Sequence, residues 1–311
     1  MFISRKVWYM LLLISMIIIS GCQTAQIPTK QPGKLLIYTS IYPIEYFAKR
    51  IGGNQVQVHN LVPPGVEPHD FELLPKQRAA LQEADLILYN GGGFENWLEK
   101  VKQSDSNQKR WVEVSKGLLT IAEREGAEHE KEEHGHGVDP HIWLDPALAK
   151  KQAEQITQAL MKVDEKHKDT YQKNMDQLAK QFDQLDQSFQ QMVNRAGKKE
   201  FVVSHSAFAY LAKKYGLEQI AVSGISPVDE PSAKELTSIV QTMQAHQLKY
   251  IFFETLVHPK VAQTIQREAH ATVLTLNPLE GLTKKEMDQG SDYFTVMEQN
   301  RQNLAKALES Q

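Results

Sequence analysis

Short runs of apolar and β-branched residues recur in both halves of the chain, separated by segments with helical spacing. In the first half these runs occupy residues 35–39, 55–62, 85–90 and 110–114. In the second half they occupy residues 201–204, 220–222, 250–253 and 272–276. Strands that alternate with helices are typical of parallel sheets with helices on their faces. The pattern therefore predicts an α/β protein with two parallel-sheet lobes of about four units each.

Between the two halves, residues 164–194 contain no glycine or proline and carry one apolar stripe at helical spacing. The stripe consists of Tyr171, Met175, Leu178, Phe182, Leu185, Phe189 and Met192. The stretch predicts a helix of about 31 residues, roughly 46 Å long, with Asp164 as its N-cap and Gly197 as its stop. A heptad-like stripe also fits a coiled coil. We favour one long helix that packs along both lobes, because both flanking segments are α/β.

The first 22 residues have the features of an export signal rather than of a folded element. Two basic residues precede an apolar run over residues 7–19, which is short for a membrane span. The sequence Ile-Ser-Gly-Cys follows and ends at Cys22. This segment resembles the lipobox of bacterial lipoproteins, in which the chain is cleaved before the cysteine and the thiol is acylated. An uncleaved anchor helix is the alternative.

These features suggest a division of the whole chain. We expect a signal peptide at residues 1–21, a tether at 22–34, an N-terminal lobe at 35–145, a helical linker at 146–197 and a C-terminal lobe at 198–311. No other stretch is apolar enough to cross a bilayer, so we expect the remainder to be soluble and extracytoplasmic.

Net charge and cysteine content argue against several classes of protein and of site. The chain of 311 residues has a formal net charge of -3, whereas nucleic-acid-binding proteins usually carry a basic excess. Cys22 is the only cysteine, so neither an intramolecular disulfide nor a cysteine-based zinc site can form. The eleven histidines are then the main candidates for metal chemistry.

Three of the histidines lie in loops next to predicted strands. His69 lies in a proline-rich turn after the second strand, His205 ends the strand at 201–204, and His141 lies in the motif Asp-Pro-His-Ile-Trp-Leu-Asp-Pro. Ligands of open parallel sheets bind beyond the carboxyl ends of strands. The spacings specify no site by themselves, so a shared metal site requires the fold to bring these residues together. Candidates to orient the second ring nitrogens are Asp70, Asp139, Ser204 and Ser206.

A further signal is the segment 123–137, EREGAEHEKEEHGHG, with a local charge of about -4. Its three histidines are His129, His134 and His136. A tract that mixes histidine with carboxylates is typical of metal binding, so we predict an auxiliary loop that collects a divalent cation near a tighter site. An inert solvated loop is the alternative. We treat the other histidines as surface or structural: His59, His167, His246, His258 and His270.

Taken together, the motifs resemble the zinc- and manganese-binding solute-binding proteins of bacterial ABC importers. The resemblance rests on the lipobox, the Pro-Pro-Gly turn before His69, the acidic histidine-rich loop, the motif at 139–146, the sequence Ser-His-Ser-Ala-Phe from Ser204, and the long dividing helix. It covers essentially the whole mature chain. It implies two α/β lobes joined by one long rigid helix, with a metal site in the cleft between the lobes.

The resemblance also implies a set of ligands. The three histidine ligands fall on His69, His141 and His205. In many members the fourth ligand is an aspartate before a Pro-Leu pair, but this chain has Asn277 there, a poor zinc ligand. Glu280 resembles the glutamate of a zinc-specific, Gram-positive-type subgroup, and we predict it as the fourth ligand. A water molecule and Glu67 are the alternatives.

Three imidazoles and one carboxylate suit zinc, whereas manganese prefers more oxygen ligands. The resemblance implies a monomeric, lipid-anchored protein that captures Zn(II) outside the cytoplasm and delivers it to an ABC-type permease with its ATPase. The alternatives are a carrier of manganese or another divalent metal, a metal-dependent adhesin and a zinc hydrolase. A hydrolase is disfavoured, because the chain has no His-Glu-x-x-His motif and a closed four-ligand set leaves no open position. We expect no enzymatic activity.

Overall fold

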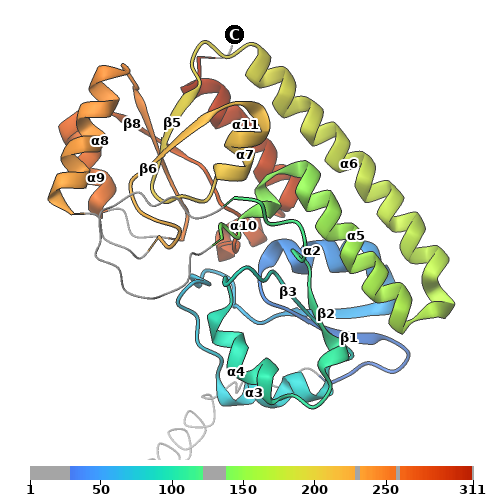
Figure 1. Ribbon diagram of the computed structural model, residues 1–311. Helices are drawn as coiled ribbons and strands as arrows, with labels where there is room; N and C mark the ends of the chain where they lie inside the picture. Colours follow the sequence, from blue (N-terminus) through green and yellow to red (C-terminus); the bar gives the residue numbers. More distant parts are fainter. Residues whose placement is uncertain (1–28, 122–137, 228–231, 257–259, 310–311) are drawn as a thin grey trace, which may run out of the picture.

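The computed structural model describes residues 29–121, 138–227, 232–256 and 260–309. It consists of two α/β lobes with one long helix, residues 168–194, running along one side of both (Figure 1). This architecture confirms the predicted fold class. The signal peptide, Cys22 and the three histidines of the acidic loop lie outside the described residues, and the domain boundaries drawn from the sequence stay predictions. Within the described ranges, no helix is long and apolar enough to cross a membrane.

Each lobe contains a four-stranded parallel sheet. The N-terminal strands are β1 Leu35–Thr39, β2 Val56–Asn60, β3 Leu86–Tyr89 and β4 Trp111–Glu113. The C-terminal strands are β5 Glu200–Val203, β6 Glu218–Ala221, β7 Tyr250–Phe253 and β8 Thr272–Thr275. The strand orders, β2-β1-β3-β4 and β6-β5-β7-β8, are the same in both lobes. The strand order therefore reverses between β1 and β3 and between β5 and β7, where open sheets bind ligands beyond the strand ends.

Helices cover both sheets (Figure 1). The α-helices are α2 Tyr42–Gly52, α3 Pro75–Ala80, α4 Asn96–Ser104, α5 Pro146–Val163, α6 Lys168–Asn194, α7 Ala209–Tyr215, α8 Ala233–Ala245, α9 Lys260–Ala269, α10 Lys284–Asp288 and α11 Tyr293–Ala307. Short 3-10 helices occur at Gly53–Gln55, Leu81–Glu83, Gln108–Arg110, Ile142–Leu144 and Glu165–His167. Helix α5 begins where Asp145 accepts hydrogen bonds from the backbone N–H groups of Ala147 and Leu148, with Pro146 at the first helical position.

The long helix forms as predicted in its body but not at its start. All seven residues of the apolar stripe are buried, and α6 ends at Asn194. Asp164, with φ -138° and ψ 69°, is both the C-cap of α5 and the N-cap of the 3-10 turn Glu165–His167, which leads directly into α6. Its carboxylate accepts hydrogen bonds from His167 Nδ1 and from the Tyr171 hydroxyl, both at 2.6 Å. Helix α6 therefore begins at Lys168 and is about 40 Å long, and His167, expected on its polar face, lies in the preceding 3-10 turn.

One hydrophobic core joins the two lobes. The buried stripe of α6 packs in the same cluster as residues of the N-terminal sheet, such as Ile37, and of the C-terminal sheet, such as Phe201. Helix α6 contacts α5, α2, α7 and α11, so it lies against elements of both lobes. This packing agrees with a helix shared by both lobes.

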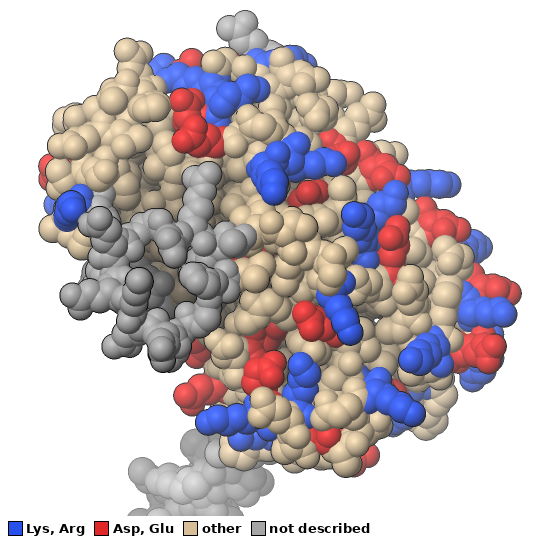
Figure 2. Space-filling model, in the orientation of Figure 1, with Lys and Arg blue, Asp and Glu red and all other residues tan. Residues whose placement is uncertain are grey.

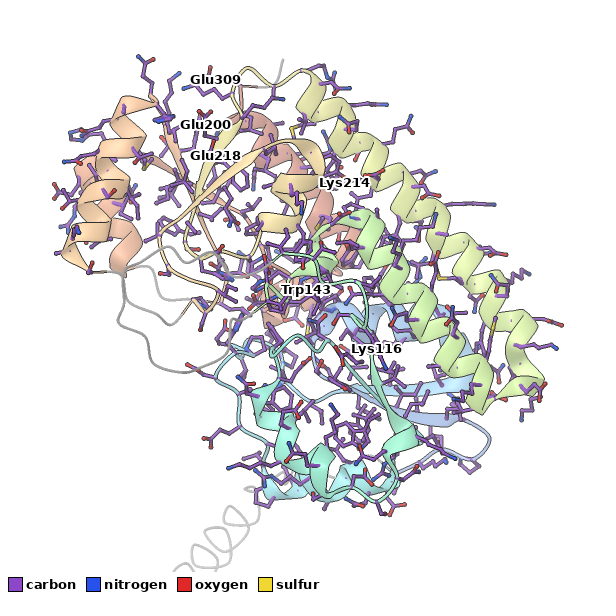
Figure 3. The ribbon with its side chains drawn as sticks, viewed as in Figure 1. Lys116, Trp143, Glu200, Lys214, Glu218 and Glu309 are labelled. Atoms are coloured by element: carbon purple, nitrogen blue, oxygen red, sulfur yellow. The ribbon has the colours of Figure 1, made fainter. Side chains whose placement is uncertain are left out.

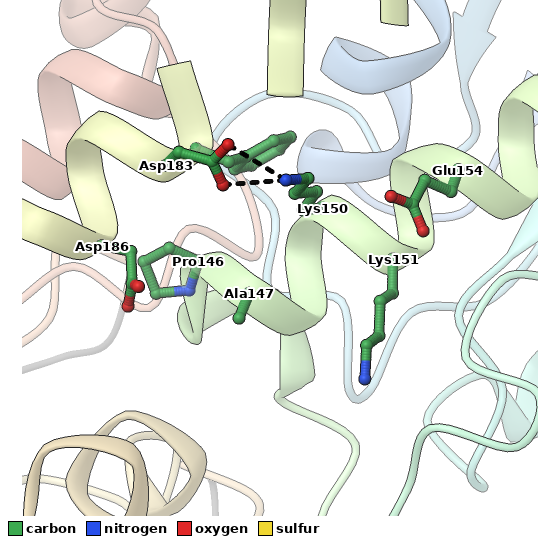
Figure 4. Close-up of a pocket in the computed structure, with 8 residues that line it drawn as sticks. Pro146, Ala147, Lys150, Lys151, Glu154, Asp183 and Asp186 are labelled. Carbon is green, nitrogen blue, oxygen red and sulfur yellow. Dashed lines mark hydrogen bonds and ion pairs between the residues drawn. The ribbon is translucent and has the colours of Figure 1, made fainter. Parts of the chain in front are cut away.

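A surface groove between α5 and α6 is lined mainly by charged residues, and its volume is about 310 Å³ (Figure 4). Within it Lys150 forms an ion pair with Asp183 at 2.8 Å, which connects the two helices. Along the α6 edge, acidic and basic side chains are interspersed (Figure 2). This solvated face contrasts with the apolar stripe on the opposite face of the same helix.

Truncation of Phe182 tests how strongly the shared core holds the lobes. Its ring packs against Phe47, Tyr293 and Phe294 at centroid distances of 5.3, 5.7 and 5.1 Å. We expect Phe182→Ala to lower the free energy of unfolding by about 3–5 kcal/mol, measured by urea denaturation. The exposed neighbour Gln184 is the matched control, and Gln184→Ala should stay within about 0.5 kcal/mol. Equal effects of the two substitutions would contradict a core that passes through α6.

Candidate metal centre

Four side chains from four separate segments meet between the lobes. His69 lies in the loop after β2, and His141 directly precedes the 3-10 helix Ile142–Leu144. His205 follows β5, and Glu280 lies in the loop after β8. The N-terminal lobe and the segment entering α5 thus supply two of them, and the C-terminal lobe supplies the other two. Trp143, two residues beyond His141, lies at the junction of the lobes (Figure 3).

The four side chains surround one point. The Oε1 atom of Glu280 lies 3.3 Å from His69 Nε2, 3.1 Å from His141 Nε2 and 3.3 Å from His205 Nε2. One ligand atom from each residue can be chosen so that all four lie within 4.8 Å of one another. Tetrahedral zinc with bonds of about 2.0–2.1 Å requires ligand atoms roughly 3.3 Å apart. The carboxylate-to-imidazole distances therefore match the edges of a tetrahedral zinc site.

Burial and unpaired atoms also fit a metal ion. His141 and His205 are fully buried, and Glu280 is 1% exposed. Within the described residues, His205 Nε2 and Glu280 Oε2 are buried and have no hydrogen-bond partner. Buried polar atoms are normally paired, and an unpaired one calls for a water or an ion. These atoms are therefore available to a cation.

The second ring nitrogens of two histidines are fixed by carboxylates. His141 Nδ1 lies 2.8 Å from Asp139 Oδ1, which also accepts the His141 backbone N–H at 2.9 Å. His205 Nδ1 is hydrogen-bonded to Glu254 Oε1, which also accepts the Ser204 hydroxyl. A carboxylate on Nδ1 directs Nε2 toward the centre and raises the basicity of the ring.

The predicted orienting residues are only partly right. Asp139 has the predicted role, whereas Asp70 is exposed and makes no hydrogen bond to His69 among the described residues. Ser204 contacts Glu254 rather than the His205 ring, and Ser206 Oγ accepts a hydrogen bond from Gln219 instead. The partner of His205, Glu254, was missed. Its position directly after β7, beside the end of β5, was the available signal.

The electrostatics of the cluster favour an ionised carboxylate among charged imidazoles. Burial alone would raise the pKa of Glu280, but the charge of His69 and the close contacts with His141 and His205 hold that pKa well below its usual value. For His205, burial alone would lower the pKa. The neighbouring carboxylate of Glu254 outweighs burial and raises the pKa of His205 well above its usual value. Burial likewise lowers the pKa of His141, while hydrogen bonds to Asp139 and Glu280 raise it overall. Without metal, His141 and His205 therefore hold a proton more tightly than a free imidazole does.

Glu67 lies next to the cluster rather than among its four members. One of its oxygens accepts the His69 backbone N–H at 3.1 Å, and the other is buried without a partner among the described residues. Burial and the charge of Glu280 raise the pKa of Glu67 to about 8. Glu67 therefore supports the turn that presents His69.

The segment leading to His141 is held from both lobes. Asn90 at the end of β3 donates to the carbonyl of Pro140 at 3.0 Å. The hydroxyl of Tyr210 on α7 accepts the backbone N–H groups of Thr120 and Ile121, at 2.9 and 3.1 Å. The Asp139 N–H in turn donates to the Ile121 carbonyl at 3.0 Å. His141 is thus positioned by backbone contacts on both sides.

The remaining histidines that the structure describes stay outside the cluster. They are His59, His167, His246 and His270. His246, for example, pairs with Glu200 at the surface, at 3.1 Å. The side-chain amide of Asn277 donates to Glu286 and Thr255 instead. Among the described residues, the structure brings together only the four predicted side chains into such a group.

Comparison with known proteins gives one consistent family. The sequence model of one protein family, described as the periplasmic zinc-uptake complex component A, matches residues 37–307. The high-affinity zinc uptake system protein ZnuA of Bacillus subtilis is 38% identical over 283 residues, which cover 88% of each chain. The zinc-binding lipoprotein AdcA of Streptococcus pneumoniae is 34% identical over 284 residues, which cover 90% of this chain and 57% of that protein. This chain thus spans little more than half the length of AdcA.

A solved structure extends the comparison to three dimensions. The crystal structure of the Zn(II)-bound ZnuA-like domain of S. pneumoniae AdcA matches with a TM-score of 0.76 and 33% identity. The match covers 89% of this chain and 100% of that domain. Family model, sequence identity and fold agree over the same region, and the chain therefore belongs to the family of the periplasmic component A of zinc-uptake complexes.

Proposed function

We propose that this chain captures Zn(II) through His69, His141, His205 and Glu280 and delivers the ion to an ABC-type permease. The observation that carries the proposal is the meeting of three imidazole nitrogens around one carboxylate oxygen, at 3.1–3.3 Å. The relatives named as zinc uptake and zinc-binding proteins support zinc as the cargo. Three nitrogens and one oxygen suit zinc better than manganese.

The same geometry favours transport over catalysis. Catalytic zinc sites keep one position for water or substrate, whereas four protein ligands close the coordination shell. A buried, closed site suits an ion that is held and then released. Release requires a second conformation with weaker affinity, so we expect the permease to favour a state in which ligands from the two lobes separate.

The proposal also includes a lipid anchor and an auxiliary histidine-rich loop. A lipid on Cys22 would hold the protein at the outer face of the membrane, where a monomer would meet the permease and its ATPase. The histidines at 129, 134 and 136 would collect zinc at low concentration. The relative named as a lipoprotein supports the anchor.

Single substitutions test the ligand set. We expect His205→Ala to weaken zinc binding by more than about 100-fold and Glu280→Gln to weaken it by at least about tenfold, because ligand loss exceeds the effect of outer-shell changes. Zinc affinity would be measured by competition with a chromophoric chelator. His246→Ala is the matched control and should leave affinity unchanged. Wild-type affinity in both ligand variants would refute the proposed site.

Glu254 provides a second test, directed at a residue that does not touch the ion. Glu254→Gln should weaken zinc binding by about 10–100-fold, because the amide no longer supports the charge and orientation of the His205 ring. The control is Glu200→Gln, since Glu200 makes the same kind of pair with His246 at the surface. If both variants bind zinc equally tightly, the Glu254–His205 pair has no role in affinity.

Acid should weaken zinc binding. The raised pKa values of His141 and His205 mean that the zinc-free site holds protons at and above pH 6.5, and zinc must displace them. Apparent affinity should therefore rise with pH through and above about 6.5. Calorimetry in buffers of different ionisation enthalpy should show proton release on binding near neutral pH. Binding that is independent of pH, without proton release, would contradict this account.

A further inference from the structure

Glu280 is presented by a buried loop that has no regular secondary structure, between β8 and α10. Residues 276–282 are all buried, including Leu279 at 0% and Asn277 at 3% exposure. A buried irregular loop must find hydrogen-bond partners for its backbone outside regular ladders. In this loop the partners come from both lobes.

The N-terminal lobe and the segment before α5 hold the loop by its carbonyl groups. The Pro278 carbonyl accepts from Trp143 Nε1 at 2.7 Å, the Glu280 carbonyl accepts from the Tyr42 N–H at 3.3 Å, and the Leu282 carbonyl accepts from the Gly65 N–H at 3.0 Å. These bonds fix the position of the loop backbone relative to the N-terminal lobe. They do not determine in which direction the Glu280 side chain leaves the backbone.

That direction depends on Leu279, whose φ is +59°. This left-handed conformation is unfavourable for a side chain with a Cβ, so the surrounding structure must stabilise it. The stabilising contact comes from Asn277: its Oδ1 accepts the Leu279 N–H at 2.8 Å. The Asn277 side chain therefore fixes the backbone turn immediately before Glu280.

The orientation of the Asn277 amide is itself fixed. Its Nδ2 donates to Glu286 Oε1 on α10 at 2.8 Å and to Thr255 Oγ1 at 3.2 Å. Its main chain is bound on both sides by the Asn300 amide of α11, at 2.8 and 2.7 Å. Because a carboxylate only accepts, the group facing Glu286 must be a donor.

Glu286 cannot easily turn away from this contact. Its second oxygen, Oε2, accepts both the backbone N–H and the hydroxyl of Thr283, each at 2.7 Å. These bonds form the capping box at the start of α10. The carboxylate is thus held with one oxygen on Thr283 and the other on Asn277.

From this arrangement we infer that Asn277 is a positioning residue that fixes Glu280 as a ligand, and that it must be a neutral amide because it faces Glu286. The inference rests on the proposed function in one respect: Glu280 must hold the metal. An aspartate at 277 would lose the donor and place two carboxylates together. Their repulsion would turn the side chain at 277 away from Glu286 and so disturb its contact with the Leu279 N–H. A glutamine at 286 would instead place two amide donors together.

Asn277→Asp and Glu286→Gln test this inference, because each should weaken zinc binding alone and the two together should restore it. In the full chain, Asn277→Asp and Glu286→Gln should each lower zinc affinity by at least about tenfold, similar to other outer-shell changes. The double variant N277D/E286Q should recover to within about threefold of the original affinity. The reason is that the amide introduced at position 286 can donate to the carboxylate introduced at position 277, while the amide oxygen still accepts from Thr283. Zinc affinity would be measured by chelator competition.

A spectroscopic reading separates positioning from simple destabilisation. The Co(II)-substituted N277D and E286Q variants should lose intensity in the visible absorption that tetrahedral cobalt gives, and the double variant should regain it. The inference is overturned if both single variants keep wild-type zinc affinity, or if the double variant does not recover. It is also overturned if the single variants only lower the Tm of the zinc-free protein while zinc affinity and the cobalt spectrum stay unchanged.

Glu280→Gln in the same titration distinguishes this inference from the proposed function. If Glu280→Gln weakens binding and N277D does not, Glu280 is a ligand and the role of Asn277 is refuted. If neither substitution changes affinity, the ligand assignment itself fails. Should N277D not fold, E286Q and the double variant still decide the outcome.

Discussion

The structure depends on one electrostatic constraint: a carboxylate buried among three imidazoles must be neutralised. Glu280 is 1% exposed, and its Oε1 is close to all three ring nitrogens. Burying an isolated charge is costly, so the cluster is stable only with protons on the imidazoles or with a cation in their place. In the proposed site, protons and zinc would therefore compete for one set of atoms. The carboxylates behind His141 and His205 add negative charge that favours either occupant.

The construction of the scaffold explains how four distant segments can meet so closely. The two sheets have the same strand order, and His205 and Glu254 lie at the end of β5 and β7, where the order reverses. A continuous apolar core through α6 holds the lobes, and loop-to-loop hydrogen bonds such as Trp143 to Pro278 connect them near the metal centre. Such a frame restricts large relative motion, so release of the ion is expected to involve loops more than a wide hinge.

Much of this could be predicted from the sequence, because it follows from local pattern. Buried strands such as residues 250–253 are apolar runs, and the seven-residue stripe of α6 has the spacing of a helix face. The three histidines and Glu280 were predicted from motifs that resemble a known family, not from spacing. The predicted start of α6 was three residues too early, because residues 165–167 form a 3-10 turn in which Asp164 accepts hydrogen bonds from His167 and Tyr171. Glu254 and the Asn277 network depend on contacts between distant segments, which no local pattern contains.

The backbone contact between Ile121 and Asp139, the residues that flank the segment 122–137, has a consequence for how the length of that segment can vary. Ile121 and Asp139 are joined by a backbone hydrogen bond of 3.0 Å, and Tyr210 of the other lobe anchors the same stretch of chain. The entropic cost of closing a loop between two fixed ends grows only with the logarithm of the loop's length. Residues can therefore be inserted or lost between these two positions without displacing Asp139 from His141. The length and composition of the segment 122–137 can therefore differ between proteins of this architecture while the contacts that place Asp139 beside His141 stay the same.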